Sequence, residues 1–176
     1  LLYQGKFEEA LGEYRKAQVL NAADARVCNN LANVLVELKR DLPEAETLAD
    51  RAAEQFDRAF RSMREAMERE TQPAVRGARH KDVRAAELDL ASALGTLGQA
   101  RAANGKDDLA IAAWKASRDH TPLTEFDARA RRLYEIALST RRLGMAGEAR
   151  RHLEAARGEA RDPALRAKIE AALAGK

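Results

Sequence analysis

Apolar and small residues recur along the chain at helical spacing, and glycines interrupt this pattern at regular places. After three of the glycines, such residues follow at steps of five, four and three positions. The three copies are Gly5, Ala10, Tyr14 and Ala17; Gly105, Ala110, Trp114 and Ser117; and Gly144, Ala149, Leu153 and Ala156. A weaker copy, with Arg40 in the glycine position, consists of Ala45, Ala49 and Ala52. This spacing predicts a helix that begins just after each glycine and carries these residues on one face.

A second apolar pattern lies before three of these positions and indicates a preceding helix. Its members are separated by three, one and three residues, so that two large residues, a small one and a variable one share a face. The sets are Cys28, Leu31, Ala32 and Leu35; Leu94, Leu97, Gly98 and Arg101; and Leu133, Ile136, Ala137 and Thr140. Glycine ends the first helix of each pair in a left-handed conformation, and the small residues let the two helices approach closely. The chain is therefore expected to consist of helical hairpins.

The complete pattern predicts an all-α chain with short loops. The expected helices are residues 6–20, 24–39, 43–71, 82–104, 106–119, 124–143, 146–159 and 163–174. Composition supports this prediction, because the good helix formers Ala, Leu, Arg and Glu dominate and only 5% of the residues are aromatic.

The repeat is interrupted between residues 57 and 85. A continuous apolar stripe runs through EAETLADRAAEQFDRAFRSMREAMERE, and the following TQPAVRGARHKD has the proline, glycine and polar residues of a loop. We expect two over-long helices that form a hairpin. Phe60, Met63 and Met67 either pack between its arms or are offered at its tip to a partner or a second subunit. The alternative is a degenerate extra repeat with a break near Phe56.

The paired patterns resemble the tetratricopeptide repeat, a helix pair of about 34 residues with the same large, small, glycine, alanine and aromatic positions. The resemblance covers residues 1–52 and 91–160. It implies antiparallel helix hairpins stacked into a right-handed superhelical solenoid, with one over-long central hairpin and a C-terminal capping helix. The implied segments are a partial repeat at 1–22, repeats at 25–56, 91–122 and 130–161, an extended hairpin or insertion at 57–85, and the capping helix at 162–176.

The opening LLYQGKFEEALGEYRKA matches only the second helix of such a pair. We therefore expect the array to continue upstream and the helix at 6–20 to have an exposed flank. The cytoplasm is slightly favoured, but the compartment stays open, because a signal or anchor removed from upstream of Leu1 would not be visible in this sequence. No apolar run reaches the roughly 20 residues of a transmembrane helix.

Charge and candidate chemistry both argue against several functions. The 31 basic and 28 acidic residues leave a net charge of +3, so nucleic-acid binding is not expected. The three histidines have no second ligand at metal-binding spacing, and no phosphate-binding loop or nucleophile motif is found. The single cysteine, Cys28, lies on an apolar stripe and is expected to be buried. We expect neither a cofactor, a metal nor enzyme activity.

The resemblance implies that the first helix of each pair lines a concave groove, in which a partner binds as an extended peptide. The groove residues so implied are Arg26, Asn29, Asn30, Asn33, Gln99, Arg131, Tyr134, Leu138, Arg141 and Arg142. Asparagine is a mediocre helix former, and its amide can pair with a peptide main chain of any sequence. Equally, the three asparagines could bond to neighbouring helices or to the preceding loop.

The stretch RARRLYEIALSTRRLG indicates a more specific ligand. Guanidinium groups bind carboxylates with two hydrogen bonds, and Tyr134 adds a flat contact. The C-terminal half of the groove is therefore expected to receive an acidic segment or a chain-terminal carboxylate. The alternative is a solvated helix face, whose arginines pair with Glu135, Glu148 and Glu154.

Two functions follow from these observations. The first is a protein-interaction scaffold that holds a peptide or a partner protein in its groove. The second is a structural or oligomerisation module that contacts its partner through the long central hairpin. This partner could be a second copy of the chain, which would give a homodimer. RNA-binding helical repeats would need a regular base-reading pair in each repeat, and the sequence has none.

Overall fold

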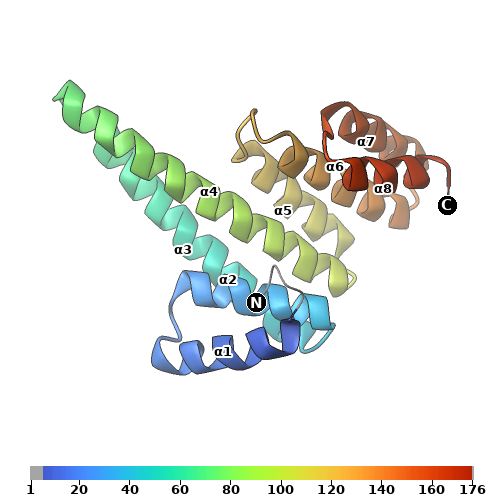
Figure 1. Cartoon of the computed structure of the whole chain (residues 1–176), viewed down its shortest axis with the longest axis horizontal. Helices are drawn as coiled ribbons and strands as arrows, with labels where there is room; N and C mark the ends of the chain where they lie inside the picture. The colour runs from blue at the N-terminus through green and yellow to red at the C-terminus, as the bar shows by residue number, and fades with distance from the viewer. Residues whose placement is uncertain (1–5, 176) are drawn as a thin grey trace.

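A computed structural model of the chain describes residues 6–175, and within them it consists of eight helices without a strand (Figure 1). The prediction of an all-α chain is confirmed. The helices are α1 (Phe7–Leu20), α2 (Ala25–Leu38), α3 (Leu42–Glu68), α4 (Pro73–Ala103), α5 (Asp107–Asp119), α6 (Phe126–Arg142), α7 (Ala146–Glu159) and α8 (Pro163–Leu173).

Each helix packs against the next one in the chain, as short loops require. Among helices that are not consecutive, the most extensive contacts are those of α2 with α4 and of α6 with α8. The hairpin of α3 and α4 projects well beyond the other helices (Figure 1). The predicted groove residues lie on α2, α4 and α6, which are the first helices of successive pairs.

The spacing that follows Gly105 and Gly144 is confirmed as the buried face of a helix, whereas in the first copy Ala10 is buried and Tyr14 and Ala17 are half-buried. Ala110, Trp114 and Ser117 on α5 are buried, and so are Ala149, Leu153 and Ala156 on α7. Gly105 and Gly144, which precede these helices, have φ angles of 74° and 80°. Glycine adopts this left-handed conformation without a steric penalty. Gly5, the corresponding residue of the first copy, lies outside the described residues.

The fourth copy differs from the expectation at its turn. Ala45, Ala49 and Ala52 are fully buried as predicted, but the left-handed residues are Lys39 and Asp41, not Arg40. Helix α2 ends where Lys39 adopts the left-handed conformation; the Lys39 N–H donates to the carbonyls of Leu35 and Val36, and the Arg40 N–H donates to the Leu35 carbonyl over 2.9 Å. These bonds hold a residue with a Cβ in a conformation that costs about 1 kcal/mol.

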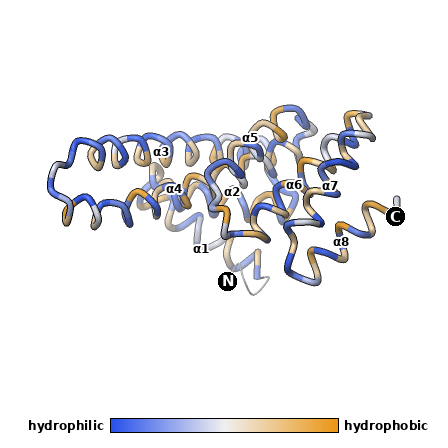
Figure 2. The backbone as a smooth tube through the Cα atoms, turned by 90° about the horizontal axis from the view of Figure 1, so that it is seen from above, coloured by the Kyte–Doolittle hydropathy of each residue, from blue (hydrophilic) through white to orange (hydrophobic). Residues whose placement is uncertain are grey.

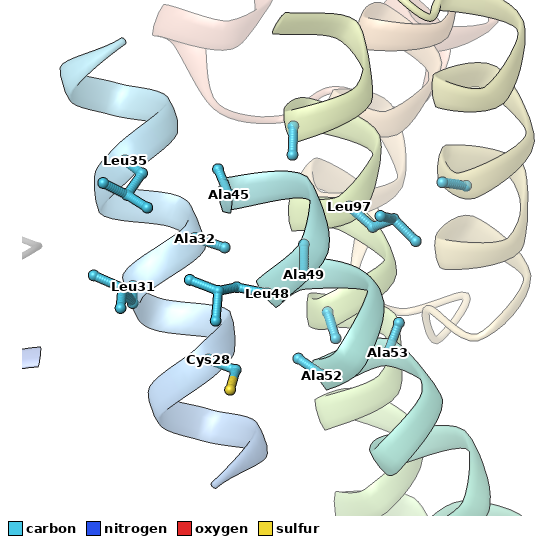
Figure 3. Close-up of a cluster of buried hydrophobic side chains, with 13 residues drawn as sticks. Cys28, Leu31, Ala32, Leu35, Ala45, Leu48, Ala49, Ala52, Ala53 and Leu97 are labelled. Atoms are coloured by element: carbon cyan, nitrogen blue, oxygen red, sulfur yellow. The ribbon is translucent and has the colours of Figure 1, made fainter. Parts of the chain in front are cut away.

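The largest core cluster joins α2 to α3 and α4. Figure 3 shows Cys28 and Ala32 of α2 directed toward α3, whose alanines and Leu48 lie opposite, with Leu97 of α4 alongside. Leu31 and Leu35 of α2 belong to the same buried cluster. The prediction that Cys28 is buried is confirmed, and burial raises the pKa of its thiol. Alanines form much of this interface, so the helix axes lie close together and few large side chains are needed to fill it.

Trp114 links α5 to α4 at a place where α4 carries two glycines. The indole is 1% exposed, and its Nε1–H donates to the Gly95 carbonyl over 3.2 Å. A Cβ at Gly98 would lie 2.3 Å from the indole Nε1, so this position has room only for glycine. Trp114 also belongs to the cluster that includes Ala110 and Ile136, and it thereby connects α6 to the same contact.

The central hairpin is longer and more helical than the sequence predicted. Helix α3 continues without interruption through Phe56, so the alternative with a break there is wrong. The predicted loop at 71–82 is also wrong, because α4 already begins at Pro73. Proline suits the first helical turn, and Gly77 within the helix costs only about 1 kcal/mol of propensity, which its helix-forming neighbours offset. Hydrophilic residues predominate along the outer hairpin (Figure 2).

Phe60 lies between the two arms and is not offered at the tip. Its side chain is 6% exposed and packs against Ala86 and Leu90 of α4. The ring also meets His120 edge-on, with 5.4 Å between the ring centroids. Of the two alternatives, packing between the arms is therefore correct for Phe60, whereas Met63, 42% exposed, remains accessible.

The two ends of the described chain differ in how well they are covered. Helix α1 fully buries Ala10 and leaves Val19 and Leu20 almost completely exposed. At the other end, Leu165 and Ile169 of α8 cover an apolar cluster formed by α6 and α7. Asp162 caps α8 through a hydrogen bond from the Ala164 N–H.

The contact of Trp114 with α4 predicts the effect of adding one methyl group. The Gly98→Ala variant should lose about 1–3 kcal/mol of unfolding free energy, since the added Cβ would overlap the buried Trp114 indole. Urea denaturation followed by circular dichroism measures this loss.

The matched control is Gly12→Ala, in the middle of α1, where no atom lies within 4 Å of the added Cβ. This change should be neutral or stabilise by about 0.5–1 kcal/mol, because alanine is the better helix former. Equal effects of the two substitutions would show that the helix-pair register is incorrect.

Candidate functional site

Two hollows lie along the surface formed by α2, α4 and α6, which we call the inner face. The asparagine hollow, about 160 Å³, is lined by Arg26, Asn29, Asn30, Phe56, Asp89 and Ser92. The arginine hollow, about 430 Å³, is lined by Val36, Gln99, Ala102, Ala103, Trp114, Glu135 and Arg142. On α2 and on α4 the members of the two hollows are separated by seven residues (Asn29 and Val36, Ser92 and Gln99), which is two helical turns. Both hollows therefore open on the same face of these helices.

The asparagine hollow brings together three of the predicted residues, Arg26, Asn29 and Asn30. The Asn29 Oδ1 atom is buried and accepts no hydrogen bond from the described residues. Arg26 pairs with Asp89 across the hollow, with 3.0 Å between Nη2 and Oδ2. Asn33 is half-buried and lines neither hollow. An amide oxygen without a partner costs free energy when it is buried, so the Asn29 side chain would be stabilised by a hydrogen-bond donor that reached it from the hollow.

Arg142, in the arginine hollow, already has an internal counter-ion. Its Nε and Nη2 atoms donate to the Asp107 carboxylate over 3.0 and 2.6 Å, and Nη2 also donates to the Ser139 hydroxyl. The hydrogen bonds from Arg142, and secondly the one from Ser139, hold the pKa of the Asp107 carboxyl below its usual value. A ligand carboxylate at this position would compete with Asp107.

Glu135 is a half-buried carboxylate among basic side chains. Burial raises its pKa, and the nearby charges of Arg132, Arg131, Arg142 and Lys168 act in the opposite direction. These four basic side chains lie near Glu135 and only Arg142 among them lines the hollow, where Asp107 is its counter-ion. The surroundings of the arginine hollow therefore carry an excess of positive charge.

Arg132 contributes to this excess from between the helices. Its guanidinium lies over Gly95, where a Cβ would be 2.1 Å from Nη2, and its Nε donates to the Ser117 hydroxyl over 3.1 Å. The Nη1 atom is buried and has no hydrogen-bond partner among residues 6–175. Burial lowers the Arg132 pKa, and Glu135 only partly opposes this effect.

The other predicted residues of α6 are divided between two environments. Arg141 donates to the Ala172 carbonyl over 2.7 Å, near the end of α8, and Tyr134 packs against the α8 cluster. Burial raises the Tyr134 pKa. Leu138 is half-buried and Arg131 is exposed. The structure thus brings Gln99 and Arg142 together and directs Arg141 and Tyr134 toward α8.

The alternative pairing of these arginines with Glu148 and Glu154 is not what the structure contains. Glu148 lies 3.5 Å from the His152 ring, and Glu154 lies 3.0 Å from Arg150, so both carboxylates face side chains of their own helix. Glu135 alone of the three lies among the α6 arginines.

Sequence reasoning missed the contributions of Asp89, Asp107, Arg132 and Lys168. Asp107 and Arg142 are 35 positions apart, and they meet because α5 begins beside the end of α6. The sequence contained one indication that Asp107 lies close to another helix end, because Asp107 begins a helix directly after the turn at Gly105. No comparable signal marked the placement of Arg132 over Gly95.

A third hollow, which we call the hairpin groove, lies between the arms of α3 and α4 and has a volume of about 510 Å³. It is lined by Arg26, Phe56, Ala59, Met63, Ala66, Arg79, Asp82, Ala85, Ala86 and Asp89. It adjoins the asparagine hollow, because Arg26, Phe56 and Asp89 line both.

Comparison with protein-family models and with curated proteins finds no match to this chain. Across residues 6–175, every helix is too short or too polar to cross a membrane. The same residues contain no group of three His, Cys, Asp or Glu side chains that could hold a metal ion.

The ion pair of Asp107 and Arg142 predicts a dependence of stability on pH. Because the Asp107 pKa is lowered by folding, its contribution is complete above the unfolded pKa of about 3.9 and is lost as the pH falls through the lower folded value. Since the Arg142 side chain is 49% exposed and therefore screened, Asp107→Asn should cost only about 1 kcal/mol at pH 7. Urea denaturation at pH 7, 5 and 3 should show this difference shrink only at the lowest pH. A difference independent of pH would contradict the assignment.

Proposed function

We propose that this chain is a protein-interaction scaffold whose inner face binds an acidic, extended segment of a partner protein. The helix pairs are related to tetratricopeptide repeats in this proposal, and they wind into a right-handed solenoid that makes the inner face concave. The function is binding and not catalysis. The excess of basic groups around the arginine hollow is the observation that carries the proposal.

The acidic character of the ligand is supported by the basic side chains near Glu135 that form no ion pair among residues 6–175. Arg142 is neutralised by Asp107, and Arg141 donates to the end of α8. Arg131 and Lys168 are exposed, lie close enough to Glu135 to influence its carboxyl, and form no ion pair among residues 6–175. An incoming carboxylate therefore interacts with Arg131 and Lys168 and leaves the internal ion pair intact.

The spacing of the two hollows supports an extended main chain. Seven residues of a helix rise about 10.5 Å. An extended peptide covers this distance in about three residues, at 3.3 to 3.4 Å for each. A segment whose backbone pairs with Asn29 and Asn30 thus reaches Gln99 three residues later, and its acidic side chain lies beyond that point, beside α6.

Fluorescence anisotropy with three labelled eight-residue peptides tests this function. The peptides alternate alanine with glutamate, glutamine or lysine. We expect the glutamate peptide to bind most tightly, and the double variant Arg131→Glu with Lys168→Glu to weaken its binding about tenfold, which is the effect of two reversed surface charges.

The matched control reverses two other exposed basic residues, Arg151→Glu with Arg166→Glu, and so changes the net charge equally. It should leave the affinity within about twofold of the original, a difference smaller than one surface ion pair produces. Equal weakening by both double variants, or equal binding of the glutamate and glutamine peptides, would refute the acidic-segment proposal.

A further inference from the structure

The outer part of the α3–α4 hairpin is a pair of helices with little to pack against. From Pro73 to Ala85, Arg79 and Val83 are the only residues that are even half-buried. Isolated helical stretches of this length are marginally stable in water, and most helix stability comes from packing an apolar face. The outer hairpin therefore has a face that gains stability when another element covers it.

The hairpin groove is the apolar surface available for this contact. Phe56, Ala59, Met63 and Ala66 of α3 follow one another at helical spacing along the groove, and Ala85 and Ala86 line its opposite side. The alanines leave room for a helix to approach closely, and methionine adapts its shape to the surface that it meets. A groove of this form suits a helix or a helix pair.

Charge is distributed unevenly along the hairpin and its base. Residues 57–85, which form the outer hairpin, contain eight basic and five acidic residues. Residues 21–56, which form α2 and the inner part of α3, contain four basic and seven acidic residues. Residues 86–103, the inner part of α4, add two acidic residues and one basic residue, so the tip region is net positive by three charges and the base net negative by four.

This distribution decides the orientation of a second copy. Two hairpins that lie side by side in the same direction place tip on tip and base on base, so that like charges meet. Two hairpins that run in opposite directions place the positive tip of each copy over the negative base of the other. The second arrangement is complementary in charge and can close about a twofold axis.

We propose that a second copy of this chain covers the hairpin groove, with the two hairpins antiparallel in a four-helix bundle. Met63 of each copy lies within the bundle, and the tip around Arg79 reaches the base around Asp89 of the other copy. This interface goes beyond the inner-face function and does not depend on the binding of an acidic segment.

Sedimentation velocity with the complete chain tests whether the dimer exists and where its interface lies. We expect a concentration-dependent species of twice the 19.4 kDa chain mass, which weakens as salt is added because salt screens the charges. The Met63→Glu variant should be monomeric, since it places a charge on the apolar floor of the groove.

The matched control is Leu88→Glu, a residue of α4 that is equally exposed at 42% and lies outside the groove. It should dimerise like the original chain, and circular dichroism should show both variants folded. A chain that stays monomeric at 100 μM, on the order of a thousandfold above a 0.1 μM dissociation constant, would overturn the proposal, as would equal loss of the dimer in both variants.

The orientation is tested by spin labels attached through Val75→Cys near the tip, with the buried Cys28 changed to Ala. From Val75 to Asp89 the helix rises about 21 Å. Antiparallel hairpins therefore keep the two labels about 20 Å or more apart, whereas parallel hairpins bring them within about 10 Å, the separation of packed helices. A short distance in a dimer that Met63→Glu abolishes would leave the groove as the interface but overturn the antiparallel arrangement.

Discussion

The close approach of α5 to α4 around Trp114 is the contact on which the arrangement of the C-terminal helices depends. Two glycines make it possible, because Gly98 leaves space for the indole and Gly95 exposes the carbonyl that accepts its Nε1–H over 3.2 Å. The same Gly95 leaves room for the guanidinium of Arg132 from α6. Three helices thus meet where α4 has almost no side-chain volume. The distances of α5 and α6 from α4 at this point are therefore limited by the α4 backbone.

The inner face takes its chemistry from this packing. With α6 held against α4, Glu135 and Arg142 lie beside Gln99 in one hollow. The start of α5 brings Asp107 to Arg142, so one arginine is neutralised internally while the surrounding basic groups keep their charge. The asparagine hollow, with Asn29 and Asn30 of α2, lies two helical turns from the arginine hollow on the same face of α2 and α4. Helix packing therefore produces a surface that combines asparagine side chains with a positive region.

The sequence was most informative where a residue's role depends on local spacing. The alanine and tryptophan positions of α5, the corresponding residues of α7 and the glycines before them followed from helical periodicity alone. Spacing was less informative where two local signals disagreed. Pro73 and Gly77 indicated a loop, but proline also starts helices, and a solvated glycine costs a helix little. Phe60 illustrates the same limit, since its stripe did not reveal whether the other arm of the hairpin or a partner would cover it.

The candidate site was predictable in its residue types and not in its pairings. Placing Arg26, Asn29, Gln99 and Arg142 on the inner face required only the register of the first helices. That Arg142 pairs with Asp107 and that Arg141 serves α8 depends on the relative positions of helices distant in sequence. Such contacts have no periodicity, and the three-dimensional packing alone determines them.

The single tryptophan of the chain offers the most direct measurement of the central contact. The account predicts blue-shifted Trp114 emission that acrylamide barely quenches, together with an indole N–H that exchanges with solvent only through unfolding, because it is buried and bonded to Gly95. Emission typical of a solvated indole, or rapid exchange of the indole N–H in the folded chain, would contradict the packing from which the inner face is built.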